Sequence, residues 1–214
     1  MNNRIKMFLS FSEELSHLIE NEGWAVRPYQ SSTLPYFQAL SDDLQDGVLK
    51  QIQDYLLICK KTMAEGYPIK DARFLVNKAL EHYSMSFHED VDELIEEGHA
   101  VEFYSLNHMQ IFRTFNCFEY TSYTIEDMYC RPWYSLYERE DKIAEQLMVL
   151  AAPVLRGEYD GIMRLEVPPH FITERASLER LQMLCESVWV APLHDEKAQT
   201  GYICIQQVKS TLQN

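Results

Sequence analysis

Through the N-terminal half of the chain, hydrophobic side chains recur every three or four positions, which is the spacing of one helix face. The first such segment, residues 12–23, opens with Ser12 as a capping residue, carries acidic residues in its first turn and ends at Gly23. Residues 24–35 contain two prolines, two serines and a threonine, and are predicted to form a loop or an extended segment. Further helices are predicted at residues 41–66, 71–83 and 90–97. Because each helix is amphipathic, we expect a helical bundle or a helical cap on the following domain.

After Gly98 the pattern changes to the two-residue alternation that is typical of half-buried β-strands. Strands are predicted at residues 100–106, 162–167, 187–193 and 201–208. The last two are joined by a polar connection suited to a hairpin, so we expect them to be adjacent in a sheet. Residues 141–155 are predicted to form a helix, and residues 178–185 either a helix or the first half of a long strand.

These elements predict an α+β fold in two parts. An N-terminal helical region, residues 1–97, precedes residues 98–210, where about five antiparallel strands form a sheet with flanking helices. A sheet with helices on one face leaves a cavity between the two layers. Many aromatic residues lie between Tyr104 and Tyr137, and we expect them to form the wall of that cavity. The alternative is that these rings simply fill the core.

Composition narrows the class of protein. The 214 residues are 46% hydrophobic and 24% charged, which excludes a disordered or low-complexity chain. Nineteen basic residues against 33 acidic ones give a formal charge of −14. Because such an acidic surface repels phosphate backbones, direct nucleic-acid binding is not expected. No apolar run approaches the roughly 20 residues of a membrane span. The short apolar stretch near the N-terminus does not fit a signal peptide, so we expect a soluble cytoplasmic protein without membrane contact.

The five cysteines indicate free thiols. They form no CxxC pair and their number is odd, which fits neither a disulfide framework nor a thiolate zinc site. We therefore expect core thiols in a reducing compartment. They are Cys59, Cys117, Cys130, Cys185 and Cys204.

The second half also resembles a known family. The segment from Tyr123 to Trp133, with its capped Thr-Ile-Glu-Asp turn and its Arg-Pro-Trp step, resembles the corresponding segment of PAS domains. Asn107, just after a predicted strand, and the acidic run at 138–141 resemble PAS positions on either side of it. The ending, 188–193 and 201–205, is similar to the last two PAS strands around their turn. The resemblance covers residues 98 to 208.

The resemblance implies a sensory and regulatory function. We expect a PAS-like sensor domain that binds a small molecule or a signalling protein and acts in signal transduction through protein–protein contacts, and that can form a homodimer. The sequence indicates no particular cofactor. The predicted ligand-binding residues are Tyr104, His108, Phe112, Phe115, Tyr120, Trp133 and Tyr134. Pro132 fixes the backbone before Trp133, so we expect a buried indole whose N–H is hydrogen-bonded by Tyr104, His108 or Tyr134.

Two alternatives come from other classes of protein. His170 and Glu174 are four residues apart and, on a helix, would share a face, where they could act as acid and base or bind a metal. A small hydrolase or transferase using this pair, or one of the cysteines, is one alternative. A pure interaction protein without a ligand is the other. The sequence contains no HExxH, GxGxxG, Walker A or GxSxG motif, so neither a metal site nor a catalytic residue is predicted.

Overall fold

The computed structural model describes residues 2–23, 33–88, 90–175, 177 and 179–210. Its N-terminal half is helical, as the spacing predicts. The helices are α1 (Asn3–Asn21), α2 (Pro35–Ala39), α3 (Asp42–Ala64), α4 (Ala72–Tyr83) and α5 (Asp90–Leu94). The helices expected from residues 41 and 71 are confirmed, and Asp71 caps α4 by accepting a hydrogen bond from the Phe74 N–H at 3.0 Å.

The prediction that the first helix starts at Ser12 is wrong. Helix α1 begins at Asn3, and the side chain of Asn2 caps it by accepting from the Arg4 N–H at 3.1 Å. Ser12 is buried in the middle of the helix, on the face that also carries Phe8. Helix α2 was not predicted; its proline stands at the first helical position, where no N–H is needed. Residues 24–32 of the expected loop lie outside the described residues.

The second half forms one antiparallel sheet, and the α+β fold class is confirmed. Its strands are β1 (His99–Ser105), β2 (Gln110–Arg113), β3 (Tyr137–Glu138), β4 (Met163–Arg164), β5 (His170–Glu174), β6 (Gln182–His194) and β7 (Gln199–Ser210). Their order is β2-β1-β7-β6-β5-β3, with β4 paired to β6. The predicted pairing of the last two strands is confirmed, and residues from Gln182 onward extend β6 rather than form a helix. The strand predicted at 162–167 is reduced to β4 at the sheet edge, before two prolines.

Helices connect the early strands to the late ones. They are η1 (Phe115–Phe118), α6 (Ile125–Cys130), α7 (Trp133–Leu136) and α8 (Asp141–Leu155). Helix α8 has the predicted bounds. Helix α6 begins with a capping box, in which the Thr124 hydroxyl accepts from the Asp127 N–H and the Asp127 carboxylate accepts from the Thr124 N–H. The neighbouring Glu126 is buried and accepts from the N–H groups of Tyr36 and Phe37, which ties α2 to α6.

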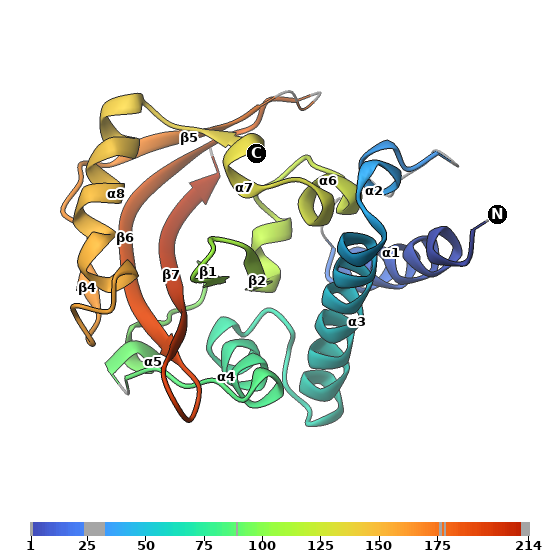
Figure 1. Ribbon diagram of the computed structural model, residues 1–214, viewed down its shortest axis with the longest axis horizontal. Helices are drawn as coiled ribbons and strands as arrows, with labels where there is room; N and C mark the ends of the chain where they lie inside the picture. The colour runs from blue at the N-terminus through green and yellow to red at the C-terminus, as the bar shows by residue number, and fades with distance from the viewer. Residues whose placement is uncertain (1, 24–32, 89, 176, 178, 211–214) are drawn as a thin grey trace.

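The two faces of the sheet are covered by different elements. In Figure 1, α8 lies along one side of the curved strands β6 and β7, and helices α1 and α3 lie on the other side of the molecule. Residues of β1 and β7 alternate between the two faces: Val101, Phe103, Ile203 and Ile205 join the core of the N-terminal helices, while Ala100, Tyr104, Tyr202 and Val208 pack with α8. The sheet is therefore the middle of three layers.

Candidate functional site: a cavity between the sheet and helix α8

A cavity of about 310 Å³ lies between the sheet and helix α8. Small valine and alanine side chains of the strands line it from the sheet, and Leu147, Ala151 and Leu155 line it from α8. Tyr137 and Trp133 reach it from the segment between α6 and α8. Its size is at the lower end of the range of about 300–1,000 Å³ for small-molecule sites, and the mostly apolar wall is typical of them.

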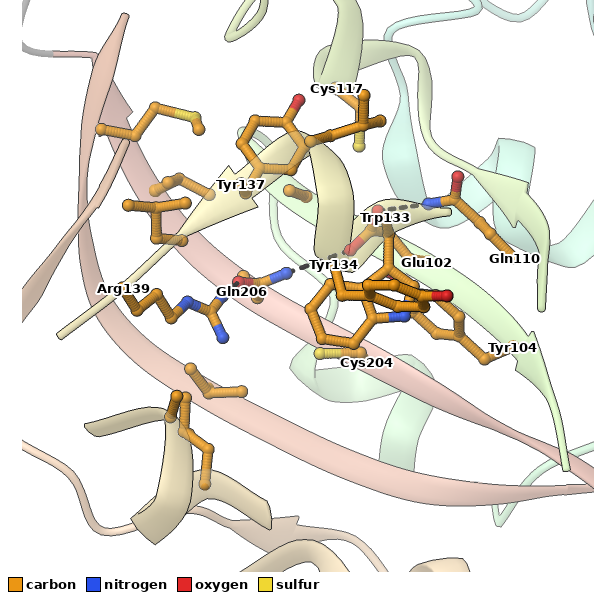
Figure 2. Close-up of a pocket in the computed structure, with 18 of the residues that line it drawn as sticks. Glu102, Tyr104, Gln110, Cys117, Trp133, Tyr134, Tyr137, Arg139, Cys204 and Gln206 are labelled. Atoms are coloured by element: carbon orange, nitrogen blue, oxygen red, sulfur yellow. Dashed lines mark hydrogen bonds between the residues drawn. The ribbon is translucent and has the colours of Figure 1, made fainter. Parts of the chain in front are cut away.

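A row of hydrogen-bonded polar side chains lies along one wall of the cavity, and the dashed lines in Figure 2 show part of it. Arg139 donates to the Gln206 side-chain oxygen at 2.7 Å, and the Gln206 amide donates to Glu102 at 3.1 Å. The Gln110 amide donates to the other oxygen of Glu102, and Arg113 donates to the Gln110 oxygen. Each carboxylate oxygen of Glu102 thus accepts a hydrogen bond from one amide, so both oxygens of this half-buried acid have a partner within the protein.

Four of the predicted ligand-binding residues line this cavity: Tyr104, Tyr120, Trp133 and Tyr134. The Tyr104 ring stacks on Tyr202 with centroids 5.2 Å apart and meets Trp133 edge-on at 6.2 Å. Burial, and then the neighbouring Glu102, raise the pKa of Tyr104, so its hydroxyl stays protonated at neutral pH. Tyr134 is 63% exposed and therefore stands at the rim.

The other three predicted residues do not line the cavity. Phe112 stands opposite Phe103 in the β1–β2 ladder, so the two rings share the face that packs on the N-terminal helices, with centroids 4.9 Å apart. Phe115 is buried in the same core. His108 lies in the β1–β2 turn with φ 59°, and its Nδ1 is 3.0 Å from the Tyr202 hydroxyl. It therefore supports a lining residue without reaching the cavity itself.

The hydrogen bond expected for the Trp133 indole is absent. Its N–H is buried and has no partner among the described residues, and the expected partners Tyr104, His108 and Tyr134 do not accept from it. The indole contacts Tyr104 and Tyr134 only through its ring, since these rings approach edge-on. One donor in the wall of the cavity is therefore left without an acceptor.

Sequence reasoning missed the polar residues of the cavity. Glu102 and Gln206 each interrupt the apolar side of a strand, and this interruption is the signal that could have identified them. Gln110 and Arg113 lie on the short strand β2, and Arg139 lies between β3 and α8. These three have no periodic pattern around them, so only the folded arrangement brings them together.

The cysteines in the wall are not activated thiols. Cys117 and Cys204 both line the cavity. Burial raises the pKa of Cys117 to about 12, and burial also raises the pKa of Cys204, so both thiols stay protonated near neutral pH. Since the thiolate is the nucleophile, neither residue is prepared for nucleophilic catalysis.

The helical placement considered for His170 and Glu174 is wrong, because both lie on strand β5. Four residues of strand separate them by about 13 Å, too far for a joint acid–base site. The Glu174 carboxylate is fully buried and accepts hydrogen bonds from Thr121, Ser122, Ser177 and the Leu181 N–H. Glu174 therefore joins three segments of the chain and has a structural role.

In the described part of the chain, no cluster of three or more histidine, cysteine or acidic side chains is placed to hold a metal ion. None of the helices in that part combines the length and the hydropathy needed to cross a membrane. Comparison of the chain with protein-family models, with curated proteins and with solved structures finds no match.

Proposed function

We propose that this protein is a sensory or regulatory module that binds a small molecule in the cavity beneath α8 and signals through protein–protein contacts. The observation that supports this best is the cavity itself, with apolar walls and a short row of polar side chains on one side. Apolar surface gives a ligand affinity, and a few fixed polar groups give it orientation. A cytoplasmic location and a homodimer are part of the same proposal.

We propose further that residues 98–210 are a PAS-like domain. Three features support this: two early strands, a group of short helices, and late strands that return beside the first one. The capped turn that begins α6 and the Trp133 step that begins α7 lie in the connecting helices. Of these helices, α7 and α8 stand on the cavity side of the sheet, through Trp133, Leu147 and Ala151.

The strands offer a direct route from the cavity to the N-terminal helices. On β1, Glu102 and Tyr104 line the cavity, while the residue between them, Phe103, packs in the helical core. On β7, Cys204 and Gln206 enclose Ile205 in the same way. A ligand that favours one position of these strands would shift the population of helix arrangements, and the helices would present the altered surface to a partner.

The test of ligand binding compares two tryptophans on opposite faces. Native mass spectrometry of gently purified protein and a thermal-shift screen of a small-molecule library should find a bound or stabilising compound. Trp133→Phe should keep the fold and weaken that stabilisation. The control, Trp189→Phe, changes a ring that packs on the helical core and should leave it unchanged. No compound by either method, or equal effects of the two variants, would contradict the proposal.

The test of signalling is amide hydrogen exchange with and without that compound. We expect altered exchange in α3 and α4, which do not touch the cavity, as well as in α8. Changes confined to α8 and the lining strands would show that the protein binds the compound but does not transmit the change to the N-terminal helices, which would contradict the proposed signalling.

A further inference from the structure

Arg139 is a cation in an apolar cavity without an acidic partner. Its guanidinium has one hydrogen bond, to the neutral Gln206 side chain, although it has five donors to offer. Within the described residues it has no ion pair, whereas Arg175, which also lines the cavity, is paired with Glu138 at 3.6 Å. Figure 2 shows Arg139 reaching toward Gln206 between two groups of carbon side chains.

From this arrangement we infer that the ligand is an amphipathic carboxylate, whose acid group binds Arg139 and whose apolar body lies between the sheet and α8. The inference rests on the proposed function and specifies the chemical class of the ligand. A guanidinium pairs with a carboxylate through two parallel, charge-assisted hydrogen bonds, which are about twice as strong as neutral ones.

The acids around the cavity do not supply this partner. Both oxygens of Glu102 accept from amides, and Glu138 is paired with Arg175 and with Arg180, the latter at 3.0 Å. Asp141 is exposed to solvent at the start of α8. Among the described residues, Arg139 therefore has no direct ion-pair partner in the cavity.

A further cation of the cavity, Arg113, already has its hydrogen-bond partners within the protein. Arg113 is only 4% exposed, donates to Gln110 and to the Met128 carbonyl, the latter at 2.8 Å, and lies over the Tyr129 ring. This comparison separates the two arginines: Arg113 holds the wall together, and Arg139 has donors left for a ligand.

The polar row also fixes the direction in which Arg139 points. Glu102 is an acceptor only, so the Gln206 amide nitrogen must face it and the Gln206 oxygen must face Arg139. Glu102 and Gln206 are therefore positioning residues for the guanidinium. The unpartnered N–H of Trp133 adds a second donor, which suits an acceptor atom elsewhere on the ligand.

A neutral analogue should bind less well for a physical reason. An alcohol of the same shape would bury Arg139 without an anionic partner, and a site built for a charged group rejects an analogue that lacks it. We expect at least a tenfold preference for the acid, which corresponds to about 1.4 kcal/mol.

The experiment is calorimetric titration of the full chain with matched pairs: octanoate against octanol, and naphthylacetate against naphthylethanol. At least one acid should bind tenfold more tightly than its alcohol. Arg139→Gln should abolish that preference and Arg139→Lys should keep part of it. The control Arg164→Gln, at an exposed arginine that is paired with Glu166 and does not line the cavity, should keep all of it. Melting temperatures of the variants establish that each is folded.

The outcomes separate this inference from the function on which it rests. Equal affinities for acid and alcohol, or a preference that persists in Arg139→Gln, would overturn the inference that Arg139 binds a carboxylate ligand. The proposal that the cavity binds a small molecule would remain. If neither the acids nor the alcohols bind, the inference of a carboxylate ligand is overturned as well. The sensory function itself fails only if the wider library and native mass spectrometry also find no ligand.

Discussion

The two faces of the sheet differ in how completely side chains fill the layer beside them. The face toward the N-terminal helices carries large residues, such as Phe103 and Phe112, that are fully buried and in ring contact. The face toward α8 carries the rings of Tyr104 and Tyr202 beside small residues such as Ala100, Val188 and Val190, and is covered by one long helix and the short α7. Too little side-chain volume remains to fill the second layer, so a cavity is left. Burial of apolar surface on one face thus stabilises the fold that holds an open site on the other.

The largest expected effect is the difference in stability loss when one large residue is replaced on each face. Phe103→Ala in the helical core should lower the free energy of unfolding by about 3–5 kcal/mol, because it removes a fully buried ring. Leu147→Ala on α8 should cost only about 2 kcal/mol, since this side chain already lacks partner atoms on its cavity side. Urea denaturation measures both losses. Equal losses would mean that the α8 face is as closely packed as the helical face.

The next effect concerns Trp133. Because this ring is only partly buried and its N–H has no acceptor, Trp133→Ala should cost roughly 2 kcal/mol, less than a fully buried ring would. It should also abolish the stabilisation that a bound compound gives, while Trp133→Phe keeps most of the stability. A loss of stability with an unchanged ligand response would show that the indole only fills space. The two variants are compared by thermal denaturation with and without the compound.

The smallest expected effect is a pH dependence. Burial raises the pKa of Cys59, in the helical core, from 9.0 to about 12. Above pH 9 the unfolded thiol ionises while the folded one does not, so stability present below pH 9 should fall as the pH rises toward 12. Urea denaturation at several alkaline pH values should give a shallower fall for Cys59→Ala than for the unchanged protein. Parallel pH profiles would show that this thiol ionises equally in both states.

The sequence patterns were informative where one element sets its own periodicity. The alternation around Phe103 and around Ile203 placed β1 and β7, and the apolar face of residues 141–155 placed α8 with its bounds. The start of α1 was missed because an asparagine cap at residue 2 lies outside the apolar pattern. Local spacing thus predicts elements better than it predicts their ends.

The site was less predictable because it depends on pairing between distant segments. Phe112 looked like a cavity residue, but its register opposite Phe103 turns it to the other face. Arg139 lies in a short connection with no periodicity, and only the fold brings it to Gln206, a residue 67 positions later. Tyr104, Tyr120 and Trp133 were placed at the cavity because large aromatic rings tend to be buried, and the cavity wall is one such place, whereas Tyr134 lies exposed at its rim.

The central claim is that the α8 face of the sheet is open to a ligand and the helical face is closed. The most direct measurement is tryptophan fluorescence in a Trp24→Phe background, with either Trp133 or Trp189 as the remaining indole. Titration with the acid and alcohol probes should change the Trp133 emission saturably and leave that of Trp189 unchanged. An unchanged Trp133 emission with every probe, or equal changes in both indoles, would contradict the account.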